Sequence, residues 1–177
     1  MEVSTSSAGT LRALRRLVRA LRLADRAAES RVGLSAAQLF VLERLAEGPV
    51  GSMAELAGRT LTDASSVSVV VQRLAERGLV VRAVASDDAR RTTLRLSASG
   101  KRLLGAAPRS PQVDLIDALE HLSPHERKDL ERLLERVVRF MGIDDAEPTP
   151  MFFEGEPSVT RSRRRVRPAG ARARSRG

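Results

Sequence analysis

The sequence predicts a mainly α-helical fold that carries one small β-hairpin. Apolar residues recur three and four positions apart through most of residues 10–142, which is the helical period. Two short segments with alternating apolar residues flank a polar, arginine-containing stretch at 85–91, which indicates a hairpin. Aromatic residues make up only 2% of the 177 residues, so the core must be built from Leu, Val and Ala, which favours helices.

The composition excludes several classes of protein. The chain has no Cys, so disulfides and thiolate metal sites are excluded, and its lack of Trp and Tyr argues against sites that stack exposed bases. The N-terminal stretch has no uninterrupted apolar region, and no segment approaches the roughly 20 apolar residues of a membrane span. We therefore expect a cytoplasmic protein with no signal peptide and no membrane partner.

The excess positive charge lies at the C-terminus. Residues 161–177 hold eight Arg and no acid, and without them the formal net charge of +9 falls to +1 for residues 1–160. We expect 161–177 to be a basic disordered tail that attracts phosphate non-specifically, although a merely solubilising tail has the same composition. Residues 143–160 are expected to form a linker, whose apolar island at 151–153 docks on its own domain or on a partner chain.

The first predicted helix covers residues 10–30, after a disordered N-terminus at 1–9, with Thr10 as its cap. Arginines fill the faces that its apolar stripe leaves. This stripe suits packing against the chain's own domain and equally suits pairing with a second chain. The stripe consists of Leu11, Leu14, Val18 and Leu21.

Three helices are predicted next, in the first part of a core at 34–104. Ser35 caps the first, with Gln38 at the capping-box position. Ser52 caps a short second helix. Thr62 or Asp63 caps the third, which ends at Gly78.

The third helix has two contrasting faces. One is a stripe of Val67, Val70, Val71 and Leu74, spaced as a buried face. The other is short and mostly hydroxylated, so it would let the backbone approach DNA closely and bond base edges or phosphate. An ordinary solvated face has the same composition, but the position of this helix before a hairpin favours DNA contact. The outward residues are Ser65, Ser66, Ser68, Val69, Gln72 and Arg73.

The hairpin is predicted to run over 79–84 and 92–96, with a polar tip between these strands. Arg90 and Arg91 at such a tip can reach a minor groove or the adjacent backbone. Asp88 would accept hydrogen bonds within the tip and fix the direction of an arginine side chain. A solvated turn is the plainer interpretation of the same residues.

The C-terminal third is predicted to be helical with two breaks. Ser97 caps a helix that Pro108 and Pro111 interrupt, and helix resumes over about 112–121. Ser123 and Pro124 then start a final helix that ends at Gly142. Its apolar stripe includes Leu130, Leu133, Leu134 and Val137.

No set of residues stands out as catalytic. His121 and His125 are four apart, a spacing that could hold zinc on one helix. The helix start at Ser123 lies between them, so they are expected on different helices. We predict that the chain is not an enzyme and has no catalytic residues, metal site or cofactor.

Residues 34–104 resemble the winged helix-turn-helix core of MarR-type regulators. The matching pieces are LSAAQLFVLERLAEG, MAELA, SSVSVVVQRLAERGLVVR, DDARR and LSASGKRLL, and with its flanking helices the resemblance covers about 11–142. It implies a winged helix-turn-helix domain over 10–142 with dimerisation helices at 10–30 and 112–142. The two apolar stripes named above would form the dimer contacts, and Asp88 and Arg90 would form the wing pair, while the role of Arg91 rests on its charge.

The resemblance implies a homodimeric, sequence-specific regulator of transcription, in this family most often a repressor. Its partner would be double-stranded DNA with a near-palindromic operator. Many relatives release DNA when a small, often aromatic or phenolic, effector binds, but the sequence assigns no residues to such a pocket. Val69 stands where many members have Arg or another polar residue, which either favours a thymine methyl contact or weakens affinity. The alternatives are a protein-interaction module that lost its operator, or a non-specific nucleic-acid-binding protein driven by the tail.

Overall fold

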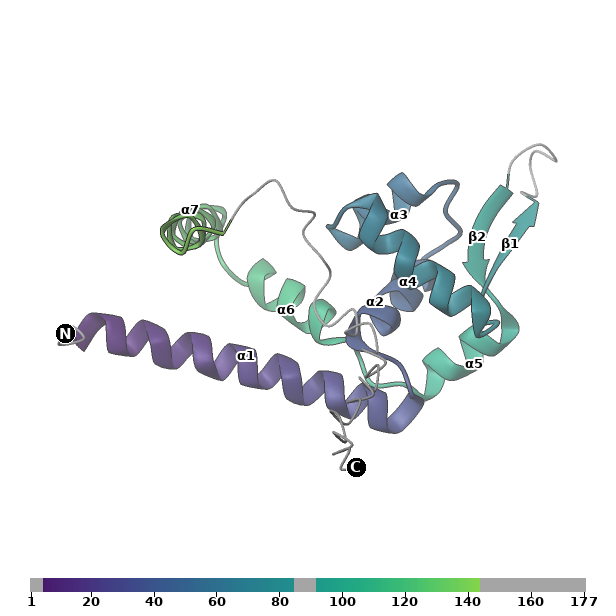
Figure 1. The fold of residues 1–177 in the computed structure, drawn as a ribbon, viewed down its shortest axis with the longest axis horizontal. Helices are drawn as coiled ribbons and strands as arrows, with labels where there is room; N and C mark the ends of the chain where they lie inside the picture. Colours follow the sequence, from purple (N-terminus) through teal and green to yellow (C-terminus); the bar gives the residue numbers. More distant parts are fainter. Residues whose placement is uncertain (1–4, 85–91, 144–177) are drawn as a thin grey trace, which may run out of the picture.

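The computed structural model describes residues 5–84 and 92–143. Figure 1 shows α2 to α5 and the hairpin gathered on one side, with α1 extending away from them and α6 leading to α7. The elements are α1 (Thr5–Val32), α2 (Ala36–Ala46), α3 (Met53–Thr60), α4 (Ala64–Glu76), β1 (Val80–Val84), β2 (Thr92–Leu96), α5 (Ala98–Ala106), α6 (Pro111–Glu120) and α7 (Pro124–Phe140).

This arrangement confirms the mainly α fold with a small β-hairpin wing. Serine caps begin four helices as predicted, because each side-chain oxygen accepts the amide of the residue three positions on: Ser35, Ser52, Ser97 and Ser123. Asp63 rather than Thr62 caps α4. The prolines also act as predicted, since α5 ends at Ala106 and α6 begins at Pro111.

The start of the first helix was predicted wrongly. α1 begins at Thr5, so Thr10 lies inside the helix rather than at its cap. Residues 5–9 contain no proline that would stop the helix from extending in this direction. At the other end α1 stops before Gly33, whose φ of +65° is a left-handed conformation that glycine adopts without strain.

The core is centred on α2, which contacts α1, α3, α4, α5, α6 and β2. Its Phe40 is the largest fully buried side chain and belongs to one hydrophobic cluster with aliphatic residues from α3, α4 and the hairpin. An 11-residue helix that is apolar on most of its surface has to be covered on most sides. α2 therefore joins α1 and α6 on one side to α3, α4 and the hairpin on the other.

The hairpin is fastened to the helices at its base. β1 and β2 pair antiparallel from Val80 opposite Leu96 to Val84 opposite Thr92. The loop between α2 and α3 adds a bridge on the outer side of β2, where Val50 and Leu94 exchange two backbone hydrogen bonds of 3.0 and 2.8 Å. The direction of the hairpin is thus tied to the helix-turn-helix.

A close contact joins α5 to the start of β1. The Ser97 hydroxyl donates to the Gly78 carbonyl (2.7 Å), and the Ser97 amide donates to the Leu79 carbonyl (3.0 Å). Gly100 then passes so close to Leu79 that a Cβ atom on it would lie 2.2 Å from the Leu79 carbonyl oxygen. Only glycine fits at this position.

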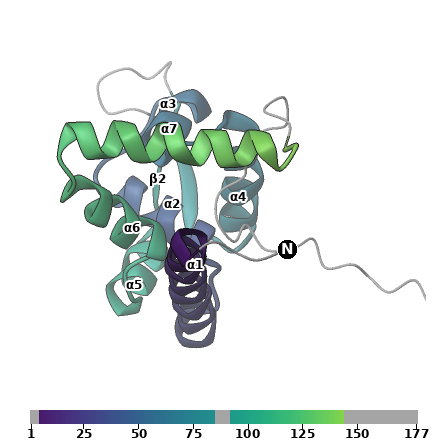
Figure 2. The same ribbon diagram turned by 90° about the vertical axis from the view of Figure 1, so that its left-hand side faces the viewer.

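The last helix packs least of all. None of the residues of α7 is buried, and α7 crosses over the N-terminal half of α1 (Figures 1 and 2). No helix within 5–84 or 92–143 has both the length and the hydrophobicity that crossing a membrane requires.

We predict that Gly100→Ala lowers the free energy of unfolding by about 1–3 kcal/mol, because its methyl group displaces α5 from Leu79. The control is Gly105→Ala on the same helix, where a Cβ meets nothing within 4 Å, so stability should be unchanged or slightly higher. Urea denaturation measures both. Equal effects of the two substitutions would contradict the close contact.

Candidate nucleic-acid interface

α4 has one buried and one open face, and both follow the same helical spacing. Val67, Val70, Val71 and Leu74 are at most 4% exposed. The residues at the matching spacing on the opposite side are exposed: Ser65, Ser68, Val69 and Gln72. Residues at i, i+3, i+4 and i+7 share one side of a helix, so these four form a single surface, which we call the open face.

Two of the predicted outward residues lie elsewhere. Ser66 is only 8% exposed, so its placement on the outward face was wrong. Its amide and hydroxyl both donate to the Asp63 carboxylate, each at 2.9 Å, because Ser66 is the third residue after the cap and turns back toward it. Arg73 is half-buried at the edge of the open face. The spacing from Asp63 to Ser66 was the sequence feature that could have shown this, once Asp63 rather than Thr62 was taken as the cap.

The cap also determines the chemistry of Ser65. The Ser65 hydroxyl donates its only hydrogen to Oδ1 of Asp63. What remains on the exposed side of this oxygen is its lone pairs, so Ser65 acts toward a ligand as an acceptor. In a major groove the matching donors are the amino groups of adenine and cytosine.

The turn before α4 contains a strained residue that the sequence did not reveal. Leu61 ends α3 in the left-handed conformation (φ +54°, ψ +40°) and is 75% exposed. Leucine is disfavoured there by roughly 1–2 kcal/mol. Arg59 stabilises the neighbouring loop, since its guanidinium donates to the carbonyl oxygens of Gly48 (3.1 Å) and Pro49 (3.3 Å) and pairs with Glu55 (2.7 Å).

The hairpin carries two exposed arginines. Arg95 lies opposite Val81 and Arg82 lies opposite Leu94 in the register. Because opposed residues share a face and neighbours alternate, Arg82 and Arg95 belong to opposite faces of the hairpin. The predicted wing residues Asp88, Arg90 and Arg91 lie outside the described residues.

The predicted dimer residues are largely uncovered. Six of them are between 37% and 49% exposed: Leu11, Leu14, Val18, Leu133, Leu134 and Val137. Leu130 is half-buried. Leu21 is an exception at 8% exposure, because its own chain covers it, and its assignment to the dimer contact stays a prediction.

The two histidines belong to different helices. His121 is the C-cap of α6, where its ring contacts the Asp117 carbonyl (2.7 Å), and His125 belongs to α7 and lies 3.2 Å from the Asp129 carboxylate. Among residues 5–84 and 92–143 no group of three or more His, Asp or Glu is placed to hold a metal ion.

Comparison with known proteins agrees with this architecture. The family model described as "MarR family" matches residues 32–91, which run from the end of α1 through α2, α3, α4 and β1. This chain belongs to the MarR family. A search of curated proteins found no match.

Two solved structures show the same winged helix fold beyond the matched segment. A MarR family transcriptional regulator from Streptomyces coelicolor, Sco3205, solved in complex with DNA, has a TM-score of 0.52 at 22% identity, and the alignment covers 83% of this chain and 98% of that one. A MepR-like protein complexed with pseudoligands has a TM-score of 0.50 at 22% identity, with 78% and 97% covered. A probable transcriptional regulator from Pseudomonas aeruginosa is 32% identical, with 70% and 92% covered and a TM-score of 0.45.

We predict that the cap of α4 makes the stability of this MarR-family chain depend on pH. Hydrogen bonds from the Ser65 hydroxyl, and then from the Ser66 amide, lower the pKa of Asp63 from 3.8 to about 2. The folded state therefore binds this proton less readily than the unfolded state. The stabilisation is complete above the unfolded pKa and is lost as the pH falls through about 2.

The measurement is urea denaturation of the wild type, Asp63→Ala and Asp63→Asn between pH 6 and pH 2. Asp63→Ala should be the less stable at pH 6, and its difference from the wild type should shrink toward pH 2. Asp63→Asn keeps an oxygen that can cap the helix but no titrating group. An Asp63→Ala difference that stays constant over this range would contradict the assignment.

Proposed function

We propose that this MarR-family chain is a homodimeric, sequence-specific DNA-binding repressor. The observation that carries the proposal is the open face of α4, on which Ser65, Ser68, Val69 and Gln72 are exposed together while the opposite side is buried. Small and polar side chains on one side of a helix allow close approach to base edges. The complex of Sco3205 with DNA supports this choice of partner.

Three residues of the open face differ in their chemistry toward base pairs. Ser65 accepts from an amino group of adenine or cytosine, because its hydrogen is held by Asp63. Gln72 donates to Glu76 at 3.1 Å, which orients its amide along the helix. Val69, 45% exposed, suits the methyl group of thymine.

The basic residues would position the protein on the duplex. Arg82 and Arg95 on the hairpin, together with Arg73 beside the open face, supply charge for phosphate contacts. In this proposal the tip residues Asp88, Arg90 and Arg91 extend the contact to the adjacent minor groove. These contacts would set the position of the protein along the duplex and the strength of binding. The open face would determine which base sequence is bound.

The uncovered apolar faces of α1 and α7 support the dimer. Both are presented by helices that project from the core, and α7 buries no residue against its own chain. An apolar surface of this extent marks an interaction site. Two copies that interlock through these helices would also set the spacing between their α4 helices, as a near-palindromic duplex requires.

Release by a small molecule is the regulatory part of the proposal. It is supported by the MepR-like structure, which was solved with pseudoligands. In this chain a direct link runs between the DNA-binding part and the dimer helices, since the Ser110 amide at the cap of α6 donates to Glu43 on α2 (2.9 Å). An effector that shifts α6 would therefore move α2 and change the spacing of the two α4 helices.

The first test is selection from a pool of random duplexes, with the enriched sites measured by fluorescence anisotropy. We expect a near-palindrome with half-sites about one helical turn apart. Ser68→Ala should reduce the preference for the selected site over a scrambled one, whereas Ser99→Ala, an exposed serine on α5, should not.

Deleting residues 161–177 distinguishes sequence-specific DNA binding from non-specific DNA binding by the basic tail. The truncated protein should keep its preference for the selected site. A folded dimer that retains no DNA would instead support the protein-interaction module. DNA binding without sequence preference that vanishes with the tail would support non-specific binding.

The second test addresses the dimer. We expect a sedimentation mass near twice 19.3 kDa. Val137→Glu places a charge on the apolar side of α7 and should yield monomers with weakened DNA binding. Arg139→Glu adds the same side chain on the other side of the helix and should remain dimeric. A wild-type monomer would refute the proposed assembly.

A further inference from the structure

Leu61, in the turn between α3 and α4, has a backbone conformation that is otherwise found only at glycines in the described chain. Its φ is +54°, and within residues 5–84 and 92–143 it is the only residue other than glycine with a positive φ. The ends of α1, α4 and α7 each lie beside a glycine with positive φ: Gly33, Gly78 and Gly142. At the end of α3 a leucine stands where glycine would carry no strain.

The hydrogen bonds of the turn impose this conformation. The Leu61 amide donates to the Gly58 carbonyl (3.4 Å), and the Thr62 amide donates to the Ala57 carbonyl (3.1 Å). This pair of bonds is the Schellman motif, in which the residue at the position of Leu61 is left-handed. The conformation therefore comes from the way α3 ends and not from the leucine side chain.

The leucine side chain contributes little to the stability of its own chain. It is 75% exposed, and among the described large apolar side chains only Phe140 is more exposed. Apolar burial stabilises in proportion to the area removed from water, so this side chain does little to offset the strain of its backbone. Glycine or asparagine would form the same turn with less strain. Burial within the single chain therefore does not account for a leucine at this position.

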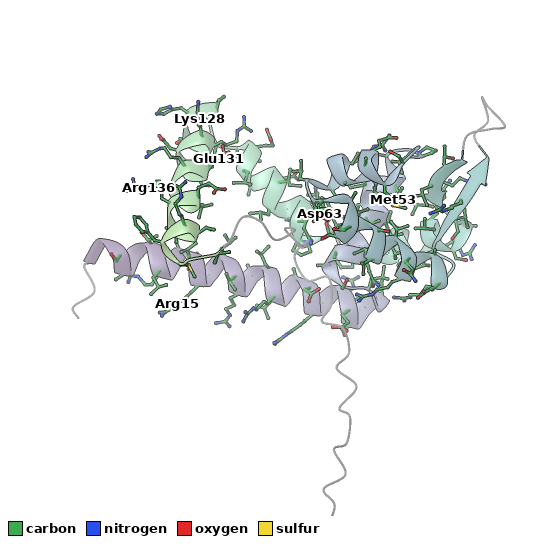
Figure 3. All side chains as sticks on the ribbon, turned by 45° about the horizontal axis from the view of Figure 1, so that its top comes forward. Arg15, Met53, Asp63, Lys128, Glu131 and Arg136 are labelled. Atoms are coloured by element: carbon green, nitrogen blue, oxygen red, sulfur yellow. The ribbon has the colours of Figure 1, made fainter. Side chains whose placement is uncertain are left out.

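Leu61 lies next to the surface that is proposed to contact base edges. Asp63, labelled in Figure 3, caps α4 two residues later, and Ser65 of the open face follows two residues after that. Four residues of chain keep the Cα atoms of Leu61 and Ser65 within roughly 14 Å of each other. A recognition helix contacts base edges with its N-terminal residues, so the turn before it lies at the same end of the contact.

The turn is held in place on both sides of Leu61. Thr60 before it is buried, and its hydroxyl donates to the Leu56 carbonyl (2.9 Å). Asp63 after it accepts from the Ser66 amide (2.9 Å). A side chain on a backbone that is already fixed loses less conformational entropy on binding. An exposed leucine on such a turn is therefore suited to an apolar contact with a ligand.

The chemistry of a duplex restricts what this contact is. The apolar group in the major groove that depends on sequence is the methyl group of thymine. Val69 of the open face suits the same group, but it lies about 8 Å along the helix from Ala64. Leu61 and Val69 would therefore meet different base pairs.

We propose that Leu61 is a specificity-determining residue, whose side chain packs against the methyl group of one thymine in each half-site. The DNA complex, in which the exposed leucine surface is covered, then accounts for a leucine at a strained turn. This inference rests on the proposed function, and it extends the surface that reads base sequence to the turn before α4.

The first experiment compares stability and DNA binding in variants of the full chain. Leu61→Gly relieves the strain and should raise the midpoint of thermal unfolding by a few degrees, whereas Leu61→Ala keeps the strain and should leave the midpoint nearly unchanged. Both should bind the selected duplex roughly 15-fold more weakly, because a lost methyl contact corresponds to roughly fourfold in each half-site. The control is Leu23→Ala, which truncates a 53% exposed leucine on α1 and should alter neither quantity.

The second experiment replaces each thymine of the selected duplex with deoxyuridine, which lacks only the methyl group. At one symmetric pair of positions the wild type should lose roughly 15-fold in affinity. Leu61→Ala should lose nothing further at that pair, because it no longer contacts the methyl groups. Val69→Ala should show the same insensitivity at a different pair of positions.

The outcomes separate this inference from the proposed function. A wild type that prefers no duplex refutes the proposed function, and the inference with it. A preferred duplex that both Leu61 variants bind as tightly as the wild type refutes the inference alone. So does a loss of affinity that no deoxyuridine substitution reproduces, since the contact would then be to the sugar–phosphate backbone. A Leu61→Gly variant less stable than the wild type would show that the leucine stabilises the free chain, which also overturns the inference.

Discussion

Burial of four apolar side chains on α4 decides which way that helix presents the rest of its surface. Val67, Val70, Val71 and Leu74 face α2 and α3, and each such burial contributes about 1.5–3 kcal/mol. A second set has the same spacing two positions earlier, so it lies on the opposite side of the helix: Ser65, Ser68, Val69 and Gln72. Burying the first set therefore exposes the second. Asp63 then fixes the start of the helix, and a 2.6 Å hydrogen bond from Arg77 to the Gly33 carbonyl fixes its end.

The same buried helix, α2, links the parts of the molecule that have separate roles in the proposed function. It packs under α4, contacts β2 and meets α6 through Glu43. The hairpin is joined to this frame by Val50 and Leu94, and α5 is joined to it by Ser97 and Gly100. By contrast, α1 and α7 leave much of their apolar surface open, so the frame is well packed while its two projecting helices remain available for a partner.

Local chemistry explains where prediction succeeded. A serine cap, a proline or a glycine acts over three or four residues, so Ser35, Ser52, Ser97, Ser123 and the break before Pro111 could be read directly. The start of α1 was missed because Thr10 can cap a helix but does not have to. The residues before it also allow a helix, and α1 begins at Thr5. Ser66 was misplaced because its neighbours share its polarity, and only its distance from Asp63 separates it from them.

The sequence by itself determined the helical periods, the caps and the order of helices followed by a hairpin, because these depend on spacing and on contacts between near neighbours. Only the tertiary structure decided that Leu21 is covered by its own chain while Leu14 and Val18 stay exposed, and that no residue but glycine fits at position 100. It also decided that the Ser65 hydroxyl donates its hydrogen to Asp63. Such outcomes depend on how elements distant in sequence meet, or on where a single hydrogen points, and residue type alone specifies neither.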